Sequence, residues 1–253
     1  HSKWRSGRVN RNGYSSRDLC KRFRMRKEWK KCSLWGFVCA RTNFIVRKRR
    51  ARMEDNMKAY LILEDGTVLT GKSIGSTGEM ISEIVFNTSM TGYLEVLTDP
   101  SYAGQAVVMT YPLIGNYGIC RKDMEAKGSH TDGFIVRELS RLGSNFRNEQ
   151  SIQDFLTEQG IPGIEGIDTR ALTKILREKG TMNGMITTRE PVGLETVLTK
   201  IKDYSVRGVV SKVTTKEMIS YKPGDLDTDS SIPVTKKVAI LDVGTKFNIA
   251  RCL

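Results

Sequence analysis

The stretch at residues 59–70, A-Y-L-I-L-E-D-G-T-V-L-T, decides how the fold begins. Its first half is rich in the apolar and aromatic residues typical of a β-strand, and residues 67–70 resume the same character. Between the two halves, Asp65-Gly66 is a dipeptide that accepts the left-handed backbone angles of a tight turn. The stretch therefore predicts a β-hairpin.

Three further apolar runs predict strands downstream of the hairpin, at residues 81–88, 106–111 and 133–139. The second run, A-V-V-M-T-Y, is apolar at consecutive positions, which is typical of a strand buried on both faces. Residues 91–102, between the first two runs, are punctuated by Gly, Asp and Pro. No regular element is predicted there.

Two helices are predicted from their end signals. Ser151 and Asp168 are residue types that cap a helix N-terminus, and each precedes apolar residues at helical spacing. Gly160 and Gly180 follow these two apolar stripes, and glycine commonly ends a helix. A third stripe covers residues 194–201. Strands that lead and helices that follow predict a mixed α/β domain, β-rich at its start.

A change of character after residue 220 predicts a domain boundary. Residues 221–237 are polar, with Pro and Gly and no periodicity, and are expected to form a linker. Residues 238–243, V-A-I-L-D-V, predict a hydrophobic strand, and residues 246–253 predict the helix after it. This order is how the first βα unit of a parallel sheet begins. A lone βα unit cannot bury both faces of its strand, so we expect the second domain to continue beyond Leu253.

The formal charge of +13 is concentrated at the N-terminus. Residues 1–52 carry 18 Lys and Arg against two acids, whereas residues 53–253 carry 23 against 26. A basic arm with interleaved aromatics suits nucleic acid, and an Arg-rich, acid-poor start also suits an organelle transit peptide. The change of composition just before Met53 and Met57 favours a third interpretation. In it, residues 1–52 are disordered or not part of the mature protein.

Length and composition exclude several classes. A chain of 253 residues, 39% hydrophobic, is long enough for about two domains with a buried core. No run approaches the ~18 apolar residues of a membrane helix, so we expect a soluble protein without a membrane partner. The five cysteines are scattered, and no Cys-x-x-Cys pair supports a metal site. They suit reduced thiols, which predicts a cytoplasmic protein.

Few residues indicate catalysis by themselves. His130 lies in a polar stretch and is expected to be a solvated loop histidine rather than a general base, because no sequence neighbour orients it. Cys120 precedes Arg121 and Lys122, which favour a thiolate, but a thiol without an identified base is more often a bystander. Neither a P-loop nor a strand-borne G-x-G-x-x-G occurs, so no phosphate-binding loop is predicted.

Several strings from residue 63 onward match one known family, in the family's order. They are L-E-D-G-T (63–67), V-F-N-T-S-M-T-G-Y (85–93), L-T-D-P-S-Y (97–102), T-Y-P with I-G-N (110–116), S-N-F-R (144–147), and I-D-T-R with L-R-E-K-G (167–180). They resemble the small, glutamine-hydrolysing subunit of carbamoyl phosphate synthase. The resemblance covers residues 57–253 and does not reach residues 1–52.

The resemblance implies two domains. Residues 57–220 would form the family's own β-rich α/β domain, and residues 238–253 would begin a class I glutamine amidotransferase domain of flavodoxin-like type. The family hydrolyses glutamine with a cysteine nucleophile assisted by a His and a Glu, all of which would lie beyond Leu253. No catalytic residue is therefore expected in this chain, Cys252 included, and residues 1–253 alone are expected to hydrolyse no glutamine.

Ser101 is the one family site residue that maps onto this chain, and the resemblance implies that it binds glutamine. A hydroxyl can donate to the substrate carboxylate and accept from its ammonium group. A serine after Pro100 also serves simply to shape a turn, which is the structural alternative.

The resemblance further implies a large-subunit partner. That subunit would use the ammonia, with bicarbonate and ATP, to make carbamoyl phosphate for arginine and pyrimidine synthesis. ATP and Mg²⁺ are expected there, with no metal or cofactor in this chain. Two alternatives stay open: a nucleic-acid-binding protein that uses the basic arm, and a non-catalytic interaction domain.

Overall fold

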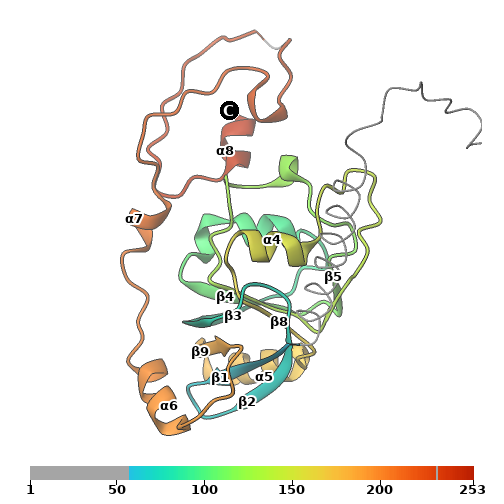
Figure 1. Ribbon diagram of the computed structural model, residues 1–253. Helices are drawn as coiled ribbons and strands as arrows, with labels where there is room; N and C mark the ends of the chain where they lie inside the picture. Colours follow the sequence, from blue (N-terminus) through green and yellow to red (C-terminus); the bar gives the residue numbers. More distant parts are fainter. Residues whose placement is uncertain (1–56, 232) are drawn as a thin grey trace, which may run out of the picture. The chain divides into compact units, whose positions relative to one another are not determined.

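The predicted hairpin forms part of a closed β-barrel in the structure, a computed structural model that describes residues 57–231 and 233–253. These residues belong to one unit that spans Arg52–Leu253. Around the barrel the strand order is β1-β2-β8-β6-β4-β3-β9, and β9 pairs with β1 to close it (Figure 1). The strands are β1 (Lys58–Leu63), β2 (Val68–Ser73), β3 (Glu79–Asn87), β4 (Gln105–Met109), β6 (Gly133–Ile135), β8 (Gly163–Glu165) and β9 (Met182–Thr187).

The hairpin is confirmed, with one refinement of its turn. Strands β1 and β2 pair antiparallel, with Ile62 opposite Val68. The N–H of Leu63 donates to the carbonyl of Thr67 at 2.9 Å, which encloses three loop residues rather than two. Only Gly66 of these has a positive φ, at 89°, a conformation that glycine adopts without steric cost. The Asp65 side chain accepts from the Thr67 N–H at 2.9 Å and completes the turn.

Strand β4 is buried on both faces, as predicted. Val107 and Met109 pack in a cluster with Phe155 of α4 (Ile152–Glu158), whereas Ala106 and Val108 pack in a second cluster with Leu172 of α5 (Thr169–Lys179). Figure 1 shows α4 and α5 on opposite sides of the strands. Successive side chains of a strand point to opposite faces, so β4 contributes to two separate hydrophobic clusters. This explains why its residues are apolar at consecutive positions.

The three predicted helices form. The Ser151 hydroxyl accepts from the N–H of Asp154 at 3.1 Å and caps α4, and the Asp168 carboxylate accepts from the N–H of Ala171 at 3.0 Å and caps α5. Gly180 ends α5, as predicted. The third helix is α6 (Leu194–Lys202), whose Ile201 packs with Ile62 and Met185 on the β1 and β9 strands.

Several elements lie outside the sequence-based prediction. Helix α3 (Tyr93–Thr98) forms in the stretch expected to be irregular, and strands β8 and β9 were not anticipated. The run at 133–139 is divided into β6 and the short β7 (Glu138–Leu139), which pairs in parallel with β5 (Leu113–Ile114). Each of these elements depends on partners far away in the sequence, and no local pattern records them.

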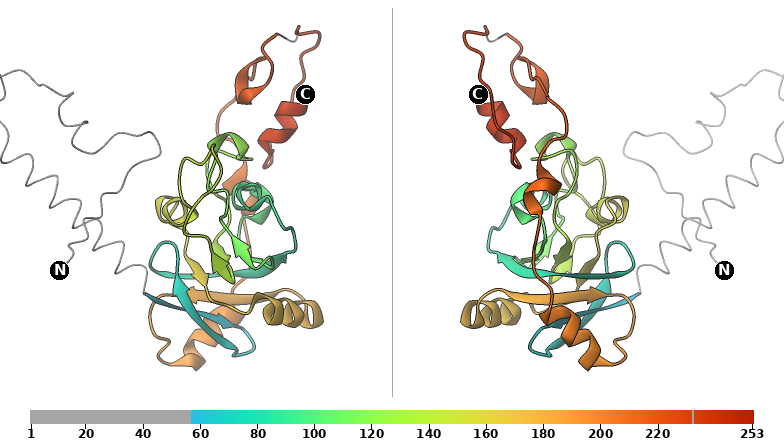
Figure 2. Two further views of the ribbon diagram at one scale, coloured as in Figure 1. Left: turned by 90° about the vertical axis from the view of Figure 1, so that its right-hand side faces the viewer. Right: turned by 90° about the vertical axis from the view of Figure 1, so that its left-hand side faces the viewer.

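The C-terminal segment is only partly as expected. After α7 (Val209–Val213), the described part of the linker contains one 3-10 turn, Asp225–Asp227. Residues 238–243, predicted as a strand, form none: no described strand pairs with them, and Leu241 is 88% exposed. A strand needs a hydrogen-bonded neighbour, which explains the difference. The predicted helix does form, as α8 (Phe247–Cys252). In Figures 1 and 2 it lies at the end of the domain opposite α6.

Closure of the barrel predicts a strict requirement for glycine at position 71. A Cβ at Gly71 would overlap the carbonyl oxygen of Glu165, where β8 pairs with β2. We expect Gly71→Ala to lower the free energy of unfolding by about 1–3 kcal/mol through overpacking. Urea unfolding measures this value, with Thr70→Ala, an exposed position on the same strand, as the control. Equal midpoints for the two variants would contradict the close approach of β2 and β8.

Candidate functional site

The candidate site is the turn that follows α3. The N-cap of helix α3 is Gly92, which has φ 83° and no side chain that could act as a cap. The Tyr117 hydroxyl instead accepts from the N–H groups of Gly92 and Tyr93, at 2.8 and 3.1 Å. The two tyrosine rings stack with centroids 4.1 Å apart, and Tyr93 donates to the carbonyl of Gly118 at 2.7 Å. A loop about 25 residues downstream therefore fixes where α3 starts.

Ser101, the predicted glutamine-binding residue, lies on a 3-10 turn, Pro100–Tyr102, that the Asp99 side chain caps. One carboxylate oxygen of Asp99 accepts from the N–H of Ser101 at 2.9 Å. Pro100 is buried, whereas Ser101 is exposed. The capped turn thus presents Ser101 at the protein surface.

The second carboxylate oxygen of Asp99 binds Lys246, which precedes α8, at 2.7 Å. The Asp99 side chain is only 14% exposed in this ion pair. Burial by itself raises the pKa of Asp99, but the hydrogen bonds from Lys246 and Ser101 outweigh it and hold the pKa below its usual value. The same carboxylate therefore joins the Ser101 turn to the segment that follows the linker.

The segment that leads into α8 begins with a turn held by the Asp242 side chain. The Asp242 carboxylate accepts from the N–H groups of Gly244 and Thr245 through one oxygen, at 2.8 and 2.6 Å, and from the N–H of Thr215 through the other, at 3.1 Å. These bonds lower the pKa of Asp242. A Cβ on Gly244 would lie 3.5 Å from the Cβ of Pro100 and 2.8 Å from a methyl group of Val213. The distance to Pro100 is an ordinary van der Waals contact, so the close approach at Gly244 is to Val213 of α7.

His130 and Cys120 have no catalytic arrangement among the described residues. His130 is half-buried rather than solvated, and its backbone N–H donates to the carbonyl of Leu97 at 3.2 Å. Burial lowers the pKa of His130, and the nearby charge of Asp99 opposes that effect. The Cys120 thiol is buried, while Arg121 pairs with Glu149 and Glu158 instead of activating it. Cys252 is a second free thiol, exposed on α8.

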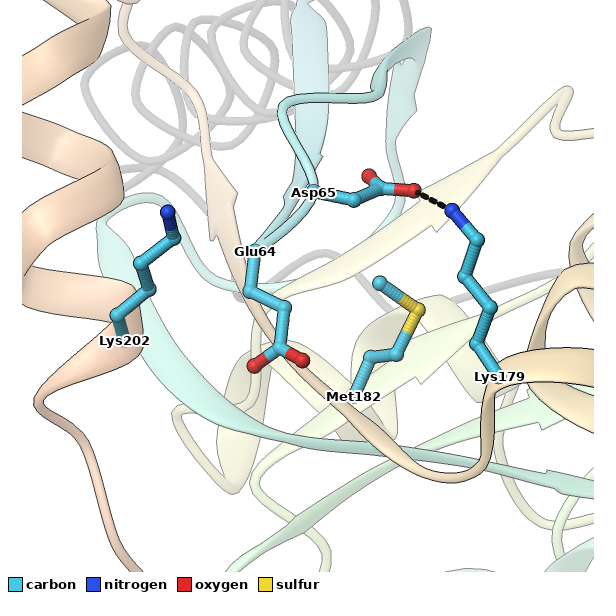
Figure 3. A pocket seen from close by; sticks show the side chains of 5 residues that line it. All are labelled: Glu64, Asp65, Lys179, Met182 and Lys202. Carbon is cyan, nitrogen blue, oxygen red and sulfur yellow. Dashed lines mark hydrogen bonds and ion pairs between the residues drawn. The ribbon is translucent and has the colours of Figure 1, made fainter.

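A separate hollow of about 410 Å³ lies between the β1–β2 turn and the C-terminal ends of α5 and α6 (Figure 3). Asp65 and Lys179 point toward one another there and pair at 2.8 Å. Burial raises the pKa of Asp65, but the hydrogen bonds from Lys179 and Thr67 lower it by more. None of the lining residues, Glu64, Asp65, Lys179, Met182 and Lys202, is a predicted site residue. We assign the ion pair to anchoring the hairpin on α5.

The described residues contain no group of three or more His, Cys, Asp or Glu side chains that could hold a metal ion. Within the same residues, no helix is both long and apolar enough to cross a membrane. The basic arm that motivated the nucleic-acid alternative, residues 1–52, lies outside the described residues.

Comparison with known proteins defines the class. Residues 61–186 match the family described as "Carbamoyl-phosphate synthase small chain, CPSase domain". The chain belongs to this carbamoyl-phosphate synthase small-chain family, which confirms the resemblance.

Three curated relatives, each named "Carbamoyl phosphate synthase small chain", show how much of the family's length is present. The chain is 50% identical to the protein of Clostridium perfringens over 195 residues, which are 77% of this chain and 53% of the relative. Identity is 47% over 205 residues for Vibrio parahaemolyticus and 45% over 201 residues for Aquifex aeolicus, each covering 77% of this chain and 54% of the relative. The chain therefore spans about half the length of these relatives.

A solved aminopeptidase from Aneurinibacillus sp. strain AM-1 aligns with a TM-score of 0.31 and 13% identity, over 51% of this chain and 30% of that chain. This likeness is too low to inform the fold or the function.

The site predicts a pH-dependent stabilisation by Asp99. Because the folded-state pKa lies below the unfolded value, the ionised carboxylate stabilises the fold above the unfolded pKa of about 3.9. This contribution is lost as pH falls through the folded-state pKa. At neutral pH we expect Asp99→Asn to lower the free energy of unfolding by about 1 kcal/mol relative to the unchanged protein.

The measurement is urea unfolding of both proteins across an acid pH series. The difference between them should shrink once the pH falls below the unfolded pKa, because a protonated Asp99 and the asparagine that replaces it are then both neutral. A difference that stays constant to the acid end of the series would contradict the role of the charge.

Proposed function

We propose that this chain is the N-terminal part of the glutamine-hydrolysing small chain of a carbamoyl phosphate synthase. The observation that carries the proposal is the match of residues 61–186 to the small-chain domain, with Ser101 exposed on a capped turn. In this function the small chain releases ammonia from glutamine. A larger chain then combines the ammonia with bicarbonate and ATP to form carbamoyl phosphate.

Ser101 would contribute to binding rather than to bond breaking. Its hydroxyl would donate to the α-carboxylate of glutamine or accept from the α-ammonium group. The nucleophile would attack the side-chain amide carbon, the C–N bond would break, and ammonia would leave with a proton from the catalytic machinery. That machinery would lie in residues beyond Leu253, in an amidotransferase domain of flavodoxin-like type that starts near residue 238.

The remaining parts of the assignment rest on the family. "Small chain" in the names of the relatives supports a larger partner chain, on which ATP and Mg²⁺ would bind. We place the enzyme in the cytoplasm, in arginine and pyrimidine synthesis. Nothing in the family match favours the nucleic-acid-binding alternative.

The test of Ser101 uses the complete small chain in complex with its larger partner. We expect Ser101→Ala to raise the KM for glutamine about tenfold, the effect of losing one hydrogen bond to a charged group. Synthesis driven by added ammonia should be unchanged, because it bypasses glutamine. Steady-state carbamoyl phosphate production with each nitrogen source measures both quantities.

Ser89→Ala is the matched control for this variant. Ser89 is also exposed, and its N–H also donates to the side chain two residues earlier, that of Asn87, at 2.8 Å. An unchanged KM for glutamine in Ser101→Ala would show that Ser101 shapes the turn and does not bind glutamine. Absence of glutamine-dependent synthesis in the unmutated complex would overturn the proposed function itself.

A further inference from the structure

A short loop beside the Ser101 turn receives the start of α8. Glu125 is the central residue of this contact and makes hydrogen bonds in two directions. Its N–H donates to the Thr98 hydroxyl at 2.9 Å. Its carbonyl accepts from the N–H of Phe247 at 2.8 Å, and its carboxylate accepts from the N–H of Asn248 at 3.0 Å. One residue thus links α3 to α8.

The bond to Thr98 connects Glu125 to the base of the site. Thr98 is the last residue of α3 and directly precedes Asp99. Its side chain is fully buried, and its hydroxyl donates to the carbonyl of Leu94 at 2.9 Å while it accepts from Glu125. Because this hydroxyl is engaged on both sides, Glu125 cannot shift without disturbing the end of α3.

The hydrogen bonds that Glu125 accepts from Phe247 and Asn248 satisfy N–H groups at the N-terminus of α8. The first N–H groups of a helix have no partner within it, and a side chain at the N-cap usually satisfies one of them. The N-cap of α8 is Lys246, which makes no capping bond with its own side chain. Glu125 supplies the acceptors instead, although it lies 123 residues before Asn248 in the sequence. The position of α8 is therefore set by the barrel domain rather than by its own sequence.

Two further contacts hold α8 at both ends. Lys246 pairs with Asp99 at the N-terminal end. Near the C-terminal end, the Arg251 guanidinium donates to the carbonyls of Lys122 and Met124, at 2.9 and 3.1 Å. Residues 122–125 thus form a seat that contacts the helix along its length.

We infer that Glu125 is a positioning residue that sets where the chain after the linker stands relative to Ser101. This inference rests on the proposed function, in which the nucleophile follows α8 in the chain. Glutamine must then touch groups from two segments that are joined by an exposed linker. Because misplacement by about 1 Å can cost 10²-fold in rate, the seat of α8 controls catalysis without touching the substrate.

The experiment compares variants of the complete small chain bound to its larger partner. Glu125→Ala removes the carboxylate acceptor, and we expect kcat/KM for glutamine to fall about tenfold. Glu125→Gln keeps a side-chain oxygen that accepts from Asn248, so its kcat/KM should stay within about threefold of the unmutated value. Ammonia-dependent synthesis should be unchanged in both. Glu64→Ala is the matched control, since the Glu64 carboxylate also accepts a backbone N–H, that of Asn183 at 3.2 Å, beside the β1–β2 turn.

A second readout reports on the seat without depending on activity. Amide hydrogen exchange of residues 247–248 should accelerate in Glu125→Ala and not in Glu64→Ala, because only the first variant frees the N–H of Asn248. The inference is overturned if exchange is unaffected, or if Glu125→Gln loses as much kcat/KM as Glu125→Ala. It is also overturned if ammonia-dependent synthesis falls in parallel. If exchange changes as expected but the unmutated complex hydrolyses no glutamine, the contact between Glu125 and α8 is supported. The proposed function is then rejected.

Discussion

One carboxylate, that of Asp99, connects the two parts of the candidate site. One of its oxygens caps the turn that presents Ser101, and the other binds Lys246 beyond the linker. The donors around it keep the carboxylate ionised although burial opposes its charge. If the carboxylate were absent, the Ser101 turn would lose its cap and α8 would lose its only described ion pair to the barrel domain. The geometry of the candidate site therefore depends on the ionised Asp99 carboxylate, and both Lys246 and the Ser101 turn help to keep it ionised.

The barrel places this carboxylate. Strands β3 and β4 run in parallel, so the chain must cross over between them, and the crossover contains α3 and the Ser101 turn. Tyr117 caps α3 from one side, and Thr98 binds Glu125 at its other end. The turn is thus fixed by loops that pack on the barrel rather than by its own short sequence. A rigid support of this kind suits the proposed role of Ser101, in which it meets a substrate held partly by another domain.

Local signals in the sequence were sufficient for much of the fold. The hairpin and the capped helices α4 and α5 were predicted because turn and cap residues lie within a few positions of the bonds they make. Helix α3 was missed because Tyr117, which caps it, lies 24 residues away from Tyr93. The strand predicted at 238–243 does not form because a hydrophobic run specifies burial and not its partner. The role of Ser101 is predicted from the family resemblance and stays a prediction. Lys246 and Glu125 carry no local signal, because their contacts form only when distant segments meet.

The most direct measurement is an experimental structure of the complete small chain with its larger partner and an unreactive glutamine analogue. We predict that the Ser101 hydroxyl oxygen lies within about 3 Å of the analogue's ammonium or carboxylate group. Asp99 should still bind Lys246 in that structure, and α8 should still rest on Glu125. An analogue bound out of reach of Ser101, with the turn unchanged, would contradict a site shared between the barrel domain and the chain that follows the linker.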